Sequence, residues 1–127
     1  MGVNIDDIQF EEGTEMPVLH PVTGELLKDD KGQAASIKLA GVDSTIYRKA
    51  ANLITNRRVK GSRNPKMTAE KLESDTLELI SKCTLSWTGI LVKKKVPATP
   101  EELYEGNKWL RQQAEEWIHD RANYLGN

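Results

Sequence analysis

The longest helical pattern of apolar residues in this chain runs from Thr68 to Gly89. Side chains three and four residues apart lie on one face of an α-helix. The pattern therefore predicts one amphipathic helix, with Thr68 as its N-cap and Gly89 as its stop. We expect the rest of the chain to cover its apolar face, which is formed by Leu72, Thr76, Leu79, Ile80, Cys83 and Trp87.

Before this segment, the pattern changes to that of short strands. Residues 16–27 form two extended pieces around the turn sequence Pro-Val-Thr-Gly, because Pro fixes φ and Gly accepts a positive φ. Residues 35–40 alternate apolar and polar side chains, as a half-buried strand does. We therefore expect a hairpin and a small antiparallel sheet of two or three strands, which needs a helix against one face.

Another helix is predicted from about Thr45 to Lys60, with Asp43 or Ser44 as its cap. Its spacing places four residues on the buried face: Ile46, Ala50, Leu53 and Ile54. Residues 61–67 form a polar connector interrupted by Pro65.

In the C-terminal third of the chain we expect an extended segment, which crosses the domain, and then two helices. The crossing covers residues 90–98. Thr99-Pro-Glu-Glu102 combines an N-cap Thr, Pro at the first helical position and Glu at the third, which is the capping-box arrangement. Gly106-Asn107 interrupts this short helix, and a longer terminal helix is expected from Lys108 to Tyr124.

These patterns predict an α+β fold, with a small N-terminal antiparallel sheet followed by a bundle of three to four helices. With 127 residues, of which 38% are hydrophobic, the chain suits one domain. Within it we expect a loosely held acidic arm at residues 1–15, a β-rich part at 16–42 and a helical part at 43–127.

Composition points away from secretion, membrane insertion and catalysis. The chain contains no run of about 20 apolar residues and starts without the basic and apolar regions of a signal peptide, so a cytoplasmic location is expected. The single cysteine, Cys83, lies on an apolar stripe and is interpreted as a core residue. Because His20 and His119 are isolated, we predict no enzyme activity, no metal site and no cofactor.

A cluster of basic residues lies where the helix at 45–60 ends and the connector begins. This predicted basic patch consists of Arg57, Arg58, Lys60 and Arg63. Such a cluster can contact phosphates, which leaves a nucleic-acid-binding module as one alternative. Aromatic residues are absent from the cluster and the net charge is −1, so the patch suits the chain's own acidic arm or an acidic protein partner better.

Several short segments, taken in order, resemble the small tail assembly chaperones of long-tailed bacteriophages and their prophage relatives. Each is degenerate, and the resemblance rests on their order and spacing from Leu19 onward. Gly106-Asn107-Lys108 departs from it, since relatives tend to be apolar or to carry proline there. The segments are Leu19-His-Pro-Val-Thr-Gly-Glu25, Ile37-Lys-Leu-Ala-Gly-Val-Asp-Ser44 with Tyr47-Arg48, Leu79 to Gly89, Thr99-Pro-Glu-Glu-Leu103, Trp109-Leu-Arg-Gln-Gln-Ala114 and Asp120-Arg-Ala-Asn-Tyr124.

The resemblance implies that the protein binds the tape-measure protein during tail morphogenesis, keeps it soluble and helps recruit tail tube protein. It also implies a location in the bacterial host cytoplasm and absence from the mature virion. Because apolar helical faces serve such binding, we predict a contact patch of Trp109, Leu110, Trp117 and Ile118. A structural tail or head-tail component of the virion is the alternative, and self-association through exposed helical stripes is a further expectation.

Overall fold

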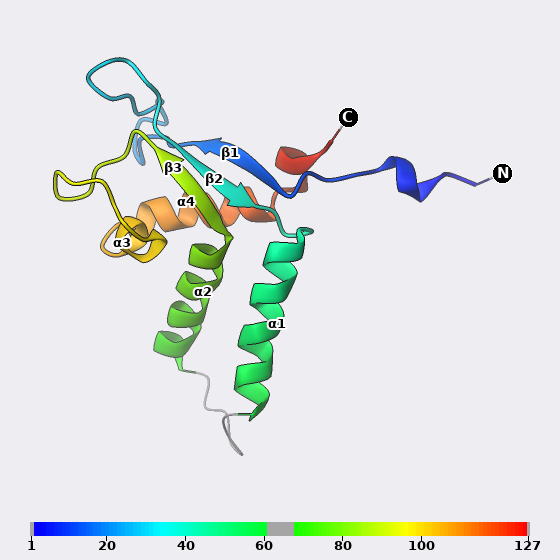
Figure 1. The fold of residues 1–127 in the computed structure, drawn as a ribbon. Coiled ribbons are helices and arrows are strands. Elements are labelled where there is room, and N and C mark those ends of the chain that lie inside the picture. Colours follow the sequence, from blue (N-terminus) through cyan, green and yellow to red (C-terminus); the bar gives the residue numbers. More distant parts are fainter. Residues whose placement is uncertain (1, 61–67, 127) are drawn as a thin grey trace.

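The computed structural model describes residues 2–60 and 68–126 and shows a three-stranded antiparallel sheet with helices packed against it (Figure 1). This arrangement confirms the predicted α+β class. The strands are β1 (Gly13–Pro17), β2 (Ser36–Ala40) and β3 (Thr84–Thr88). The helices are α1 (Thr45–Lys60), α2 (Ala69–Cys83), α3 (Pro100–Tyr104) and α4 (Lys108–His119), with short 3-10 turns η1 (Ile5–Asp7) and η2 (Arg121–Tyr124).

The two ends of the sheet differ in the segments that surround them. The strand order is β1-β2-β3, and all neighbours are antiparallel. Gly13 pairs with Ala40 at one end, which we call the Gly13 end. At the opposite end, the Pro17 end, Ser36 of the central strand lies between Pro17 and Thr88.

The predicted helix over residues 68–89 is correct only in its first part. Thr68 does cap it, since its hydroxyl accepts a hydrogen bond from Lys71 N at 3.1 Å, but α2 ends at Cys83 and the chain continues as β3. Thr and Trp favour strands, and pairing with β2 overrides the helical spacing. Trp87 therefore packs against the core from the sheet, opposite Ile37. β3 also lies inside the predicted helical part, 43–127, which is not purely helical.

The core lies between the sheet and the helices. Ile37 and Leu39 of β2 are fully buried, and α4 contributes Leu110, Ala114 and Ile118 from beneath the sheet. Ile80 and Cys83 of α2 and Leu103 of α3 complete it. The central strand is thus covered by helices from the second half of the chain.

The starts of α1, α2 and α3 follow the predicted capping chemistry, whereas Asn107 makes no side-chain capping hydrogen bond at the start of α4. Ser44, and not Asp43, caps α1, since its Oγ accepts a hydrogen bond from Tyr47 N at 3.0 Å. At α3, Thr99 Oγ1 accepts from Glu102 N at 3.3 Å. The predicted buried faces are less accurate, because Leu53 and Leu72 are 53% and 47% exposed.

Two segments near the C-terminus differ from the prediction. The terminal helix ends at His119, where Asp120 adopts an extended backbone and its carboxylate accepts from Ala122 N at 3.1 Å to start η2. The crossing at residues 90–98 contains a tight turn, because Val92 bridges Lys95 and both Lys93 and Lys94 have positive φ. Asn and Gly are the usual residues of such turns, so two lysines gave no signal.

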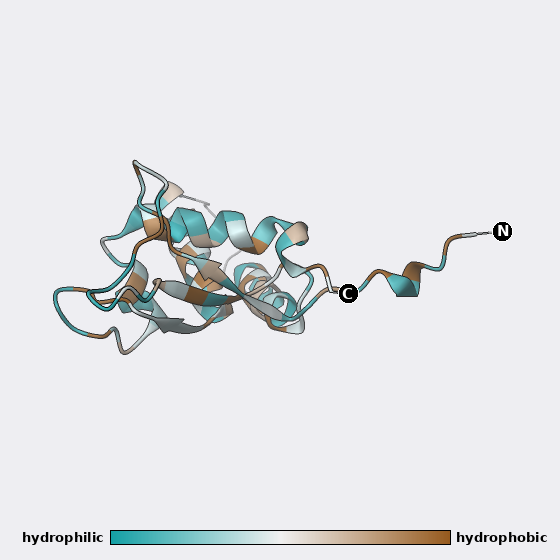
Figure 2. Ribbon diagram, turned by 90° about the horizontal axis from the view of Figure 1, so that it is seen from above, coloured by the Kyte–Doolittle hydropathy of each residue, from teal (hydrophilic) through white to brown (hydrophobic). Residues whose placement is uncertain are grey.

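Only the first half of the predicted acidic arm projects, because the second half is attached to the body. β1 begins at Gly13, inside the predicted acidic arm 1–15. Glu11 N donates to Tyr124 O at 2.7 Å, and Gly126 N donates to Gln9 O at 2.8 Å, so residues near the two ends of the chain lie side by side. Residues 2–8, which we call the projecting arm, extend away from the body and carry both apolar and polar side chains (Figure 2).

Candidate partner-binding groove

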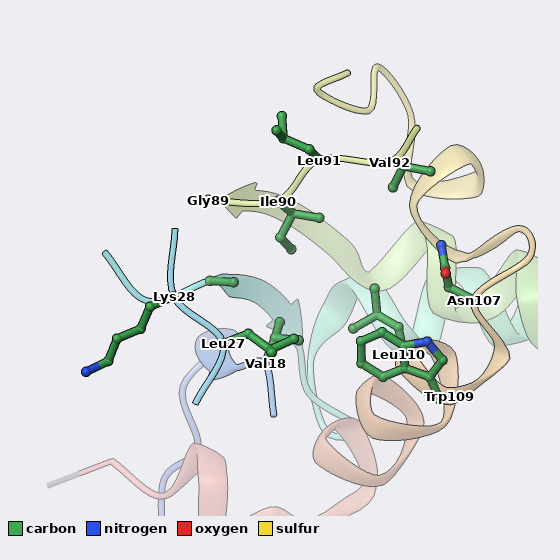
Figure 3. Close-up of a pocket in the computed structure, with 11 residues that line it drawn as sticks. Val18, Leu27, Lys28, Gly89, Ile90, Leu91, Val92, Asn107, Trp109 and Leu110 are labelled. Carbon is green, nitrogen blue, oxygen red and sulfur yellow. The ribbon is translucent and has the colours of Figure 1, made fainter. Parts of the chain in front are cut away.

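An apolar groove opens at the Pro17 end of the sheet (Figure 3). Its volume is about 190 Å³, and its walls come from the ends of the strands, the segment after β3 and the start of α4. Lys28 is the charged residue among those that line it. The groove is lined by Val18, Leu27, Lys28, Ala35, Gly89, Ile90, Leu91, Val92, Asn107, Trp109 and Leu110.

Backbone hydrogen bonds bring one wall of the groove together. Leu27 N donates to Val18 O at 3.1 Å, and Ala35 N donates to Leu27 O at 2.8 Å. Between Val18 and Leu27 the chain reverses in a tight turn, in which Gly24 N donates to His20 O at 3.0 Å. The predicted hairpin at 16–27 therefore exists as a short one, and it holds Val18 and Leu27 next to Ala35.

The opposite wall begins where β3 ends. Gly89 has a φ of +73°, and a Cβ atom at this position would lie 3.4 Å from the Cα of Ala35. A side chain there would be strained by the left-handed backbone. The turn at Gly89 directs Ile90 and Val92 toward the groove, facing Leu27 and Trp109 (Figure 3).

The predicted contact patch on α4 does not exist as one surface. Leu110 and Ile118 are 3% and 1% exposed, because both face the sheet as core residues. Trp109 is half-buried and lines the groove, whereas the Trp117 indole N–H donates to Thr14 Oγ1 at 3.0 Å beside β1. Of the four predicted residues, only Trp109 combines partial exposure with a place in the groove.

Sequence reasoning missed most of the groove. Ile90, Leu91 and Val92 lie in a connection without helical or strand periodicity, so no pattern marked them as a surface. Their signal was weak but present, because an apolar run, Ile-Leu-Val, in an otherwise polar connection is unusual for a solvent-exposed loop.

Two residues of the predicted basic patch, Arg57 and Arg58, form ion pairs with α2. Arg58 Nη2 lies 2.8 Å from Asp75 Oδ2, and Arg57 bridges Asp75 at 3.0 Å and Glu78 at 2.9 Å. Hydrogen bonding to the Arg58 guanidinium, followed by the charge of both arginines, lowers the pKa of the Asp75 carboxyl. Lys60 is exposed at the end of α1. Arg63, like the predicted connector at 61–67, lies outside the described residues.

The candidate catalytic groups have structural roles. Cys83 is fully buried, and burial raises the pKa of its thiol to about 12, so the reactive thiolate is suppressed. His20 Nδ1 accepts hydrogen bonds from Val22 N and Thr23 N, and His119 packs edge-on against Tyr47. Residues 2–60 and 68–126 contain no group of three His, Cys, Asp or Glu side chains that could hold a metal ion.

The size and lining of the groove indicate what it can bind. Small-molecule and cofactor pockets usually have volumes of about 300–1,000 Å³ and several convergent polar groups. This groove is smaller and mostly apolar. It is therefore suited to one or two apolar side chains presented by a protein segment. Within the described part of the chain, no helix has the length and apolar character needed to cross a bilayer.

In comparisons with known proteins, no protein-family model, curated protein or solved structure matches this chain.

Proposed function

We propose that this protein is a tail assembly chaperone of a long-tailed bacteriophage or prophage. In this role it binds apolar side chains of the tape-measure protein in the groove at the Pro17 end of the sheet. It keeps that client soluble in the bacterial cytoplasm, helps recruit tail tube protein and leaves before the virion is complete.

The observation that carries this proposal is the convergence of the resembling segments on the groove. Leu19–Glu25 is the turn that holds Val18 against Leu27. The segment Leu79 to Gly89 ends at one wall, and the segment that starts at Trp109 forms another. Two of the resembling segments thus contribute lining residues, Gly89 and Trp109 with Leu110, and a third connects the lining residues Val18 and Leu27.

The chemistry of the groove supports a helical client. An amphipathic helix binds by inserting apolar side chains into a hydrophobic groove, while its polar face stays in water. Trp109 and Ile90 offer partly exposed apolar surface in the groove, and Leu91 is 65% exposed beside it. Aromatic side chains in such positions often dominate the binding energy.

Co-expression with the tape-measure protein encoded beside this chain tests the proposal. We expect the wild-type protein to make the client soluble and to co-purify with it in a fixed ratio. Leu91→Asp places a charge at the groove and should abolish co-purification without unfolding the protein, because Leu91 is 65% exposed. Val59→Asp is the matched control, since Val59 is 75% exposed on α1 and does not line the groove.

Two results would contradict the proposal. One is an insoluble client in the presence of the wild-type chain. The other is the presence of this chain in purified virions at a fixed stoichiometry, which would establish the alternative of a structural tail or head-tail component.

A further inference from the structure

The projecting arm exposes apolar side chains that the rest of the described chain does not cover. Val3 is 82% exposed, Ile5 70% and Ile8 55%. Single exposed apolar residues are common, but three within six residues on a segment that leaves the body form an unpartnered apolar segment (Figure 2). Beside them lie two exposed carboxylates, Asp6 and Asp7.

The groove and the arm lie at opposite ends of the same sheet. The arm is anchored next to η2, just before β1 begins at Gly13. The groove is formed where β1 has ended, around Val18, and where β3 has ended, at Gly89. Figure 1 shows the arm extending away from the sheet and therefore away from the groove of its own chain.

The charges near the groove are opposite to those of the arm. Lys28 lies at its rim, and the turn that follows Val92 carries Lys93, Lys94 and Lys95, all exposed. A neighbouring cleft shares Val92 and is lined by Lys93 and Lys95 together with Glu102 and Glu105. The 93–95 turn, with three lysines beside Glu102 and Glu105, therefore has a net positive charge.

We propose that the projecting arm of one copy of this chain binds in the apolar groove of a second copy. Ile5 and Ile8 of the arm place their side chains against Ile90 and Trp109, while Asp6 and Asp7 face the lysines of the 93–95 turn. This inference concerns two copies of one chain and stands independently of the proposed client.

The geometry makes this contact head-to-tail. Because the donor arm and the acceptor groove are different surfaces on opposite ends of the sheet, each copy can give its arm to one neighbour and receive an arm from another. Such heterologous contacts produce rings when the rotation closes and open helical chains when it does not. The expected assemblies of the full chain therefore extend beyond a dimer as concentration rises.

Analytical ultracentrifugation of the full-length protein over a concentration series tests the inference. We expect the wild type to self-associate, and the arm variant Ile5→Asp/Ile8→Asp to raise the dissociation constant by about tenfold or more. The groove variant Leu91→Asp should weaken association similarly, and Ile90→Asp is a second groove variant. Val59→Asp, away from both surfaces, should associate like the wild type.

Mixing the variants gives the sharpest result. The arm variant keeps an intact groove and Leu91→Asp keeps an intact arm, so an equimolar mixture should form 1:1 heterodimers and nothing larger. A monomeric wild type at all concentrations would overturn the inference. So would association that both variants leave unchanged, or a mixture that stays monomeric while the wild type associates. None of these outcomes depends on whether the tape-measure protein binds.

Discussion

A buried pair of hydroxyl groups joins α3 to the start of β3. Thr84 Oγ1 lies 2.8 Å from Ile80 O and 2.7 Å from Tyr104 Oη. A carbonyl oxygen can only accept, so Thr84 donates to Ile80 and Tyr104 donates to Thr84. Burial raises the pKa of Tyr104 to about 12, which keeps the phenol protonated and able to donate.

This direction of the hydrogen bonds makes the two partners unequal. Tyr104→Phe leaves Thr84 bonded to Ile80, and we expect it to lower the free energy of unfolding by about 0.5–1.5 kcal/mol. Thr84→Val leaves the buried Tyr104 hydroxyl without a partner and should cost about 1–3 kcal/mol. Urea unfolding of both variants checks the order. A larger loss in Tyr104→Phe would show that the proton donors are assigned the wrong way round.

For single residues, the sequence predicted burial correctly at only some positions of a helix's apolar face and poorly at the edge of that face. Cys83 was predicted as a core residue from its apolar stripe and is buried, whereas Leu110 and Ile118, predicted as contact residues, are also buried. Trp109 lies just beside that face, where period alone does not distinguish core from surface. Its place in the groove depends on Ile90 and Val92, which are brought there by tertiary contacts.

Among the elements, α1 and α2 run side by side and are joined by a network of ion pairs (Figure 1). Asp75 is 6% exposed and contacts both Arg57 and Arg58. We expect Asp75→Asn to lower the thermal unfolding midpoint more than Glu78→Gln does, because Glu78 contacts Arg57 alone at a more exposed position. Equal midpoints for the two variants would show that the double contact of Asp75 adds nothing.

The same carboxylate gives this network a pH dependence with a defined sign. The arginines lower the folded-state pKa of Asp75 below its ordinary value of 3.8. The folded state therefore binds fewer protons, so the stabilisation is fully present above the unfolded-state pKa and is lost as pH falls through the folded-state pKa. The difference in midpoint between wild type and Asp75→Asn should thus be constant near neutral pH and should disappear in acid.

Element boundaries show where local sequence stops being sufficient. The start of α2 was predictable because Thr68 caps it by accepting a hydrogen bond from Lys71 N, only three residues along the chain. Its end was not, since the apolar spacing from Ile80 through Trp87 fits a helix, and only pairing with β2 makes residues 84–88 a strand. The turn at Lys93 and Lys94 was not predictable either, because lysine, unlike Asn or Gly, does not indicate a positive φ.

In the whole molecule, the two proposals assign one groove to two occupants, a client segment and the arm of a second copy. If both are correct, client binding and self-association exclude each other. The apparent affinity of the wild type for its client should then fall as the chain concentration rises, because a growing share of grooves is filled by arms. The arm itself, being at the opposite end of the sheet, does not affect client binding within one copy.

The variant Ile5→Asp/Ile8→Asp tests whether arms of other copies compete with the client for the groove. This variant keeps the groove, so its client affinity should equal that of the wild type at low chain concentration and exceed it at high concentration. Titration of a labelled tape-measure fragment at two chain concentrations measures both values. If the wild type self-associates and yet its client affinity does not change with concentration, client and arm bind different surfaces. In that case Leu91→Asp identifies the occupant of the groove, because it weakens only the interaction that uses this surface.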